Sequence, residues 1–110
     1  MEKKNFYKKI LIISSNFYPE ISNNLQEGVL EVLKSENINF ELKSINGSLE
    51  IPFFLEKFKK QYLGYIIIGC IIKGETDHYE VVKNITFPQI YKIAYENILP
   101  LSSALLTVEN

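Results

Sequence analysis

Four apolar runs are spaced along the chain, and each has the character of a buried strand. KKILIISS and LGYIIIGCII hold consecutive apolar residues rich in isoleucine, which is typical of strands covered on both faces. INFELKSI alternates instead, with Ile38, Phe40 and Leu42 on one face, and LPLSSALLTV follows near the last residues. These runs predict four strands of one sheet.

The segments between the strands carry apolar residues at spacings of three and four, which is the spacing of one helix face. Pro19 stands where a first helix can begin, because the N–H that proline lacks has no helical partner at that position. The stripe of this helix consists of Ile21, Leu25, Val29, Val32 and Leu33. A short second helix is predicted over residues 51–58, with an apolar side made of Phe54, Leu55 and Phe58.

A third helix is predicted from about His78 to Asn97, and Pro88 lies inside it. Proline within a helix removes a hydrogen bond and clashes with the preceding turn, at a cost of about 3 kcal/mol. We therefore expect a kink at Pro88 or a break into two shorter helices. The apolar stripe of this segment consists of Val81, Val82, Ile85, Ile90, Ile93 and Ala94.

Strands and helices alternate along the chain without an internal repeat or a long linker. This order is typical of an α/β fold, in which a parallel sheet with right-handed crossovers carries helices on its faces. Ligands of such sheets bind at the carboxyl ends of the strands. The loops NFY, NGSLE and KGETDH each follow a predicted strand. We therefore expect these loops to meet at one edge of the sheet and to form a site there.

The composition narrows the class of protein. With 110 residues, 46% apolar content and a net charge of -1, we expect a single domain over residues 1–110, with residues 1–8 as an N-terminal tail. A near-neutral chain has no long-range field to attract nucleic acid or an acidic membrane. One cysteine and one histidine exclude an internal disulfide and a cysteine- or histidine-rich metal site. The apolar run 10–13 is too short for a signal peptide or membrane span, so a cytoplasmic protein is expected.

The loop KGETDH holds groups suited to an anion and to proton transfer. A helix that begins after Gly74 would present free N–H groups to an anion, with the Thr76 hydroxyl as a further donor. In that arrangement the Glu75 N–H points inward while its carboxylate points to solvent. His78 can take or give a proton near neutral pH. The alternatives are a plain helix cap formed by Thr76 and a surface histidine without a role.

Three further positions have both a functional and a structural interpretation. Phe17 could stack on a flat heteroaromatic ligand or cover the core. Glu50 could accept hydrogen bonds from sugar-type hydroxyls or face water. Cys70 lies inside a predicted strand without a neighbouring cation in the sequence, which favours packing over nucleophilic chemistry.

Three longer motifs resemble the 6,7-dimethyl-8-ribityllumazine synthase family of riboflavin biosynthesis. They are GSLEIP at 47–52, GCIIKGETDHYEVV at 69–82 and ALLTVEN at 104–110, and NFYPEIS matches the first loop of the family. The resemblance extends from about Lys9 to the last residue. It implies a three-layer α/β/α fold with a four-stranded parallel sheet, flavodoxin-like, with the C-terminal helix of the family missing.

The resemblance implies a transferase that condenses 5-amino-6-(D-ribitylamino)uracil with 3,4-dihydroxy-2-butanone 4-phosphate and needs no cofactor. His78 is implied as the catalytic group that moves the proton. The positions implied to bind the substrates are Phe17, Ser48, Leu49, Glu50, Cys70, Ile71, Ile72, Glu75, Thr76 and Ser103. The family also implies a homo-oligomer, a pentamer or a multiple of it, with sites between subunits.

The chain departs from the family pattern at several positions. Lys73 replaces an arginine, and Ser103 replaces a larger side chain that frames the pyrimidine from an adjoining subunit. The family continues past TVEN with a phosphate-binding arginine and a helix, so weaker phosphate binding is expected here. Three hypotheses follow. They are an active lumazine synthase with a shortened C-terminus, a truncated non-catalytic paralogue that serves as a ligand-binding or assembly subunit, and an unrelated flavodoxin-like phosphate-binding domain.

Overall fold

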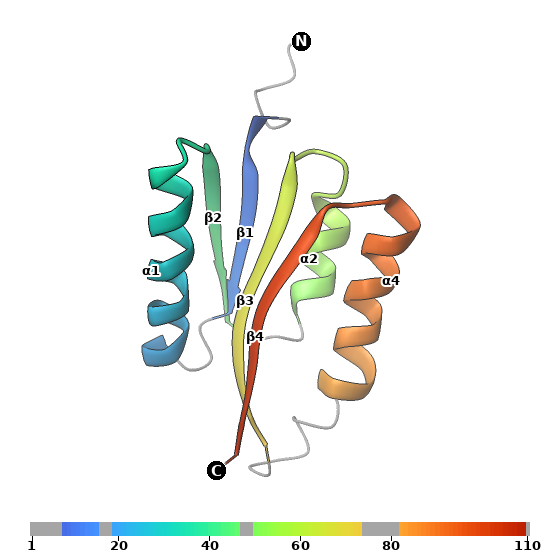
Figure 1. The fold of residues 1–110 in the computed structure, drawn as a ribbon. Coiled ribbons are helices and arrows are strands. Elements are labelled where there is room, and N and C mark those ends of the chain that lie inside the picture. The colour runs from blue at the N-terminus through green and yellow to red at the C-terminus, as the bar shows by residue number, and fades with distance from the viewer. Residues whose placement is uncertain (1–7, 16–18, 47–49, 74–81, 110) are drawn as a thin grey trace.

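Four parallel strands form one sheet in the order β2–β1–β3–β4 (Figure 1). The computed structural model describes residues 8–15, 19–46, 50–73 and 82–109. The strands are β1 (Ile10–Ser15), β2 (Phe40–Ile45), β3 (Gly64–Lys73) and β4 (Leu101–Glu109). The sequence predicted each of these strands, and their parallel pairing confirms the expected α/β fold.

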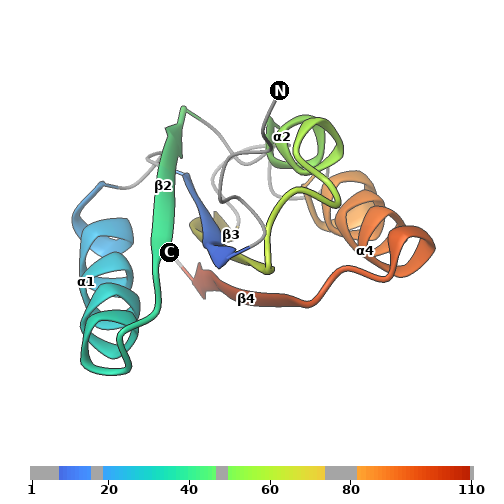
Figure 2. The ribbon, with the colours of Figure 1, turned by 90° about the horizontal axis from the view of Figure 1, so that it is seen from above.

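Helices cover both faces of this sheet, which gives three layers (Figures 1 and 2). Helix α1 (Pro19–Ser35) lies alone on one face among the described elements. Helices α2 (Ile51–Lys57) and α4 (Phe87–Asn97) lie side by side on the other face. No helix within the described ranges is long and apolar enough to span a membrane.

The larger part of the core lies between the sheet and the helices α2 and α4. Alternate residues of the central strands point to this side, as Leu11 and Ile13 of β1 show, and both are fully buried. The aromatic residues around α2 continue this core, because Phe54, Phe58, Tyr62 and Tyr65 contact one another in series. The buried members of this cluster are Leu11, Ile13, Ile45, Ile51, Leu55, Tyr62, Tyr65, Ile67, Ile90 and Ile93.

A smaller core lies under α1, where Ile12, Leu33 and Ile68 are buried. The residues that were predicted to share one face of the second strand pack there together, which confirms that prediction. The predicted stripe of α1 is confirmed at Leu25, Val29 and Leu33. Val32 is 60% exposed, so its place in the stripe was wrong. At that point of the helix Leu33 alone takes the inward position.

The segment around Pro88 breaks as expected. A π-helical stretch, η3 (Val82–Thr86), comes first, and α4 then begins with Pro88 in its first turn, where proline removes no hydrogen bond. A π-helix has more residues in each turn than an α-helix, so it rotates the following side chains out of the predicted stripe. Ile85 is therefore 61% exposed, contrary to the prediction, and Thr86 is buried in its place.

Candidate functional site

The carboxyl ends of the strands lie at one edge of the sheet, as a parallel arrangement requires (Figure 1). Ser15 and Ile45, the last residues of β1 and β2, are direct partners, so these two strands end at the same level. Six of the candidate residues lie in the segments that follow β1, β2 and β3 and are outside the described residues. They are Phe17, Ser48, Leu49, Glu75, Thr76 and His78.

Strand β3 extends past its neighbour β1 at this edge. Its pairing with β1 ends at Ile68, opposite Ser14, whereas its pairing with β4 continues to Lys73. The extension, residues 69–73, is five residues long and spans roughly 16 Å at about 3.3 Å a residue. Within the described part of the chain, β4 alone pairs with this extension.

Among the described residues, no strand pairs with this extension on the side of β3 that faces away from β4. Cys70, Ile71 and Ile72, three of the candidate positions, all lie within it. An unpaired strand edge presents alternating N–H donors and C=O acceptors. Such an edge suits a flat ligand with adjacent donors and acceptors, as the imide edge of a pyrimidine has. The candidate role of these three residues uses their main chain and does not depend on their side chains.

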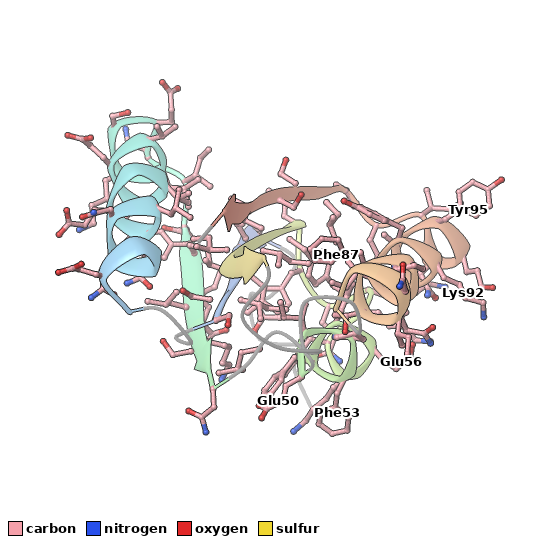
Figure 3. The ribbon with its side chains drawn as sticks, turned by 90° about the horizontal axis from the view of Figure 1, so that it is seen from below. Glu50, Phe53, Glu56, Phe87, Lys92 and Tyr95 are labelled. Atoms are coloured by element: carbon pink, nitrogen blue, oxygen red, sulfur yellow. The ribbon has the colours of Figure 1, made fainter. Side chains whose placement is uncertain are left out.

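Glu50 lies at the amino end of α2, directly before Ile51 (Figure 3). Because α2 follows β2 and returns along the sheet, its first turn lies near the carboxyl ends of the strands. Glu50 is exposed, and its side chain makes no capping hydrogen bond to the helix. Its carboxylate is therefore not committed to holding α2 and can accept hydrogen bonds from a ligand.

Ser103 lies on β4, a little before this edge. It pairs with Ile67 on β3, three positions before Cys70, and Ile67 in turn pairs with Ile13 of β1, two positions before the last residue of that strand. Its side chain is exposed on β4, the last strand in the order of the sheet.

A buried hydroxyl that the apolar pattern did not predict lies near the end of β1. Ser14 is fully buried, and within the described structure its Oγ has no hydrogen-bond partner. Ile10 and Ile12, at alternate positions of the same strand, pack on the side of α1, so Ser14 faces that side too. Serine is small and only mildly polar, so a serine at the end of an apolar strand barely alters the hydropathy pattern.

Among the described residues, the strongest pKa shift of an acidic group is that of Tyr62, at the other end of the sheet. Burial raises the pKa of Tyr62 well above its usual value, and the hydrogen bond that Tyr62 donates to Glu41 raises it further. Glu41 is the second residue of β2, so this pair belongs to the amino edge. Tyr62 and Glu41 therefore hold the fold together and take no part in the candidate site. Within the described ranges, no cluster of three or more metal-ligating side chains occurs.

Comparison with known proteins identifies similar chains. A sequence model of the 6,7-dimethyl-8-ribityllumazine synthase family matches residues 7–110. The lumazine synthase of Bartonella bacilliformis is 34% identical over 113 residues, which cover 99% of this chain and 74% of that protein. The proteins of the same name from Bartonella tribocorum and Burkholderia vietnamiensis are 35% and 36% identical. They are matched over 92% and 93% of this chain and over 69% and 63% of their own lengths.

Proposed function

The chain belongs to the 6,7-dimethyl-8-ribityllumazine synthase family, and on that premise we propose that it is a transferase of riboflavin biosynthesis. It condenses 5-amino-6-(D-ribitylamino)uracil with 3,4-dihydroxy-2-butanone 4-phosphate to 6,7-dimethyl-8-ribityllumazine. The observation that carries this proposal is the family match over residues 7–110, which includes all the candidate segments. The parallel sheet supports it, because the strands before three of those segments end at one edge.

The pyrimidine substrate binds along the extension of β3. Its imide edge exchanges hydrogen bonds with the main chain of Cys70, Ile71 and Ile72. In the described part of the chain only β4 pairs with this stretch, which supports this role. Phe17, two residues after the end of β1, stacks on the ring. The ribityl chain extends toward Ser48 and Leu49.

Glu50 accepts hydrogen bonds from the ribityl hydroxyls. Its exposure and its lack of a capping hydrogen bond support this role. Hydrogen bonds to a charged acceptor contribute about 1.5–3 kcal/mol each, so one such bond can account for roughly a tenfold to hundredfold change in affinity.

The phosphate of the second substrate binds at the turn after β3. The N–H groups of Glu75 and Thr76 donate to its oxygens, and the Thr76 hydroxyl adds a third donor. The amine of the uracil then attacks the ketone and forms a Schiff base with loss of one water. Phosphate is eliminated, and the ring closes with loss of a second water. His78 moves the proton during these steps. The amine is itself the nucleophile, so the protein supplies orientation, an anion site and one proton carrier, and no cofactor is required.

The active form is a homo-oligomer in the cytoplasm, a pentamer or a multiple of it. The family match supports an assembly of this kind. Ser103 is exposed on β4 and would join the site of an adjoining subunit in such an assembly.

An assay with both substrates tests the proposal. We expect the product to form faster than in the spontaneous reaction, measured by lumazine absorbance and fluorescence. His78→Ala should lower kcat by about a hundredfold, the effect of losing a general acid–base group. Glu50→Gln should instead raise the KM for the ribityl substrate by roughly tenfold or more, because it weakens a charge-assisted acceptor.

Glu31→Gln is the matched control, since Glu31 is an exposed carboxylate on α1, on the other side of the sheet from α2. Its kinetics should equal those of the parent. Product formation no faster than the spontaneous background would contradict the proposed function. An unchanged rate for His78→Ala in an active protein would contradict the role of His78 alone.

A further inference from the structure

A pocket of about 630 Å³ lies at the amino edge of the sheet, where α1 ends and where β1 and β2 begin. We name it the amino-edge pocket, and its lining consists of Lys9, Lys34, Asn37, Ile38, Asn39 and Phe40. The whole length of β1, six residues or roughly 20 Å, separates this edge from the candidate site at the other edge. The volume is in the usual range for sites that bind small molecules.

The amino-edge pocket offers hydrogen-bond donors that no other group of the described structure uses. Among the described residues, no carboxylate lies within ion-pair distance of Lys9 or Lys34. The side-chain amides of Asn37 and Asn39 make no hydrogen bond within the described ranges. An ammonium group only donates, and the nitrogen of an amide donates as well. The pocket therefore presents two cations and two neutral donors to a ligand, which suits an anion.

Main-chain hydrogen bonds fix the segments that carry these donors. Asn37 has a left-handed φ of 59°, and its N–H donates to Lys34 O at 3.2 Å. The Ile10 N–H donates to Asn39 O at 2.9 Å, which joins the start of β1 to the residue before β2. Lys9 directly precedes Ile10, so it is held beside the end of α1. The donors of the pocket thus come from separate elements that the fold brings together.

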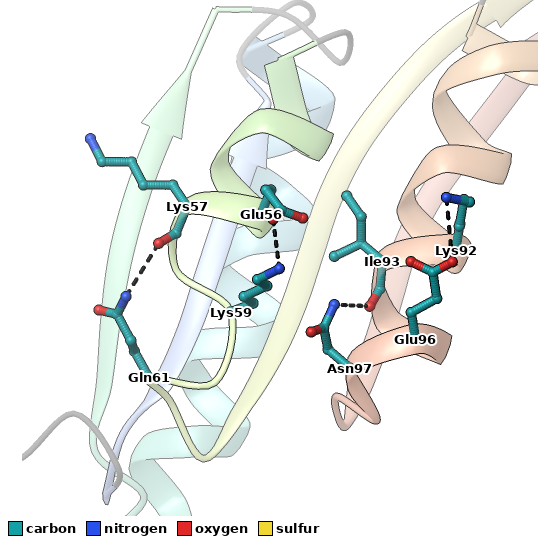
Figure 4. A network of polar contacts seen from close by, with 8 residues as sticks. All are labelled: Glu56, Lys57, Lys59, Gln61, Lys92, Ile93, Glu96 and Asn97. Carbon is teal, nitrogen blue, oxygen red and sulfur yellow. Dashed lines mark hydrogen bonds and ion pairs between the residues drawn. The ribbon is translucent and has the colours of Figure 1, made fainter.

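The charge around the pocket is positive, although the whole chain carries a net charge of -1. The strand starts, helix ends and connections at this edge comprise residues 8–9, 34–39, 56–63 and 96–100. They hold six lysines and three glutamates, a net charge of +3, which leaves -4 for the rest of the chain. One of these glutamates is already paired, because Glu56 Oε2 lies 2.6 Å from Lys59 Nζ (Figure 4). The Leu63 N–H donates to Lys9 O at 2.7 Å, so the connection that carries Lys59 lies beside the pocket.

A purely structural role would account for Lys34 but not for the rest of the pocket. A cation in the last turn of a helix offsets the helix dipole, and Lys57 has the same place in α2 that Lys34 has in α1. Lys9 precedes a strand, so the dipole gives no reason for it. The end of α1 opposes an anion only weakly, because Leu33 O already accepts from the Ile38 N–H at 2.9 Å. Charge-assisted hydrogen bonds are the stronger effect.

We propose that the amino-edge pocket binds a compact polyphosphate anion, a diphosphate or triphosphate group. Lysine suits this ligand, because its ammonium group is a point charge that binds phosphate oxygens without a fixed plane. Lys9 and Lys34 supply two positive charges inside the pocket, and Lys8 and Lys60 are exposed at the same edge. This number of cations favours an anion with two or more phosphate groups over a single phosphate. The positive charge acts over a short range in physiological salt, so it selects among anions that enter the pocket.

Isothermal titration calorimetry of the full chain with sodium tripolyphosphate at low salt tests this inference. Tripolyphosphate should bind at least tenfold more tightly than inorganic phosphate does. Lys34→Gln should weaken its binding about tenfold, the effect of losing one charge-assisted hydrogen bond, and the fold should be kept because Lys34 is exposed. Asn39→Ala should weaken binding less, because it removes a neutral donor.

The matched control is Lys57→Gln, which removes the same charge from the last turn of α2, where the exposed Lys57 lies outside the pocket (Figure 4). Its affinity for tripolyphosphate should equal that of the parent. An absence of binding at about 1 mM tripolyphosphate would overturn the inference. Equal losses in Lys34→Gln and Lys57→Gln would also overturn it, because they would show attraction by the whole edge. An unchanged affinity in Lys34→Gln would place the anion elsewhere, at the turn after β3 for example. The titration contains neither substrate, so its outcome is independent of the enzyme assay.

Discussion

Tyr62 is a buried residue whose hydroxyl also donates a hydrogen bond to a carboxylate, and both properties raise its pKa. Its ring lies between Phe58 and Tyr65, with centroid distances of 6.2 Å and 6.0 Å, and its hydroxyl donates to the Glu41 carboxylate. Tyr65 adds a second anchor, because its hydroxyl donates to Phe58 O at 2.6 Å and accepts from the Gln61 N–H at 3.2 Å. Together the two phenols fix the connection between α2 and β3.

Replacing Tyr62 with phenylalanine should therefore make stability less dependent on alkaline pH. The raised pKa means that the folded state holds the phenol proton more tightly than the unfolded state does. This contribution is fully present below the ordinary tyrosine pKa of about 10 and is lost as the pH rises above it. At pH 7, Tyr62→Phe should lower the free energy of unfolding by about 1–2 kcal/mol.

Urea denaturation of parent and variant at pH 7 and at about pH 11 checks this expectation. The difference in the free energy of unfolding between the two proteins should be smaller at about pH 11. At that pH the parent loses part of the stabilisation from the protonated Tyr62 phenol, which the variant lacks at both pH values. A difference that stays constant or grows with pH would contradict the role of the Tyr62 proton.

Ser14 and Ser15 are adjacent buried serines, and their replacement by alanine should change the free energy of unfolding in opposite directions. The Ser14 hydroxyl has no hydrogen-bond partner in the described structure, whereas Ser15 does have an interacting partner. Ser14→Ala should raise the free energy of unfolding by about 1 kcal/mol, because it removes a desolvated polar group that nothing compensates. Ser15→Ala should lower it by a similar amount, about 1 kcal/mol. Equal effects of both changes in urea denaturation would refute the distinction.

At the scale of elements, the glycines of α1 and β3 differ in what surrounds them. A side chain at Gly28, within α1, would meet no other heavy atom within 4 Å. Gly28→Ala should therefore raise the free energy of unfolding by about 0.5–1 kcal/mol through backbone entropy alone. Gly64 begins β3, and a Cβ there would lie 3.1 Å from Ile10 Cδ1 and 3.4 Å from Pro100 O.

Gly64→Val is the contrasting variant, and it should lower the free energy of unfolding by about 1–3 kcal/mol through overpacking. Thermal and urea unfolding of the two variants against the parent check the pair. A stabilised Gly64→Val, or a destabilised Gly28→Ala, would show that the space around these positions differs from the structure described.

The helices and strands could be predicted from the spacing of apolar residues wherever one constant period applies along the whole element. The alternation of Ile38, Phe40 and Leu42 predicted one face of the second strand. All three pack against the core under α1, but β2 begins only at Phe40, so Ile38 lies before the strand. Periodicity failed at Ile85 because the π-helical turn before Pro88 shifts the helical register. A stripe drawn at a constant spacing carries no information on where a helix changes its number of residues per turn.

At the scale of the whole molecule, protection from hydrogen exchange should follow the pairing of the sheet. β1 lies between β2 and β3, and residues 65–68 of β3 pair with both β1 and β4. Amides there should exchange most slowly, whereas some amides of residues 69–73 should exchange faster because in the described structure only β4 pairs with them. Adding the ribitylaminouracil substrate should slow exchange in residues 69–72.

Mass-spectrometric exchange with and without this substrate measures both effects. Uniform protection along the whole of β3 would contradict the open edge. Protection that appears on α1 in place of β3 would move the pyrimidine site to the other face of the sheet.

The fold could be predicted almost completely from the sequence, whereas the site could be predicted only in part. Motif resemblance supplied the candidate residues, and the alternation of strands and helices brought their loops to one edge. The extension of β3 past Ser14 could not be predicted, because the length of a strand's pairing depends on its neighbours. Phe17, Thr76 and His78 lie outside the described residues, so their roles stay predictions.

The extension of β3 has a consequence for how this sequence can vary over generations. Hydrogen bonds to main-chain N–H and C=O groups do not depend on which side chains the residues carry. If the pyrimidine is recognised along this edge, positions 70–72 can accumulate neutral substitutions as long as they keep an extended backbone and avoid proline. The residues of the loops would then tolerate far fewer substitutions than the strand residues that bind the pyrimidine.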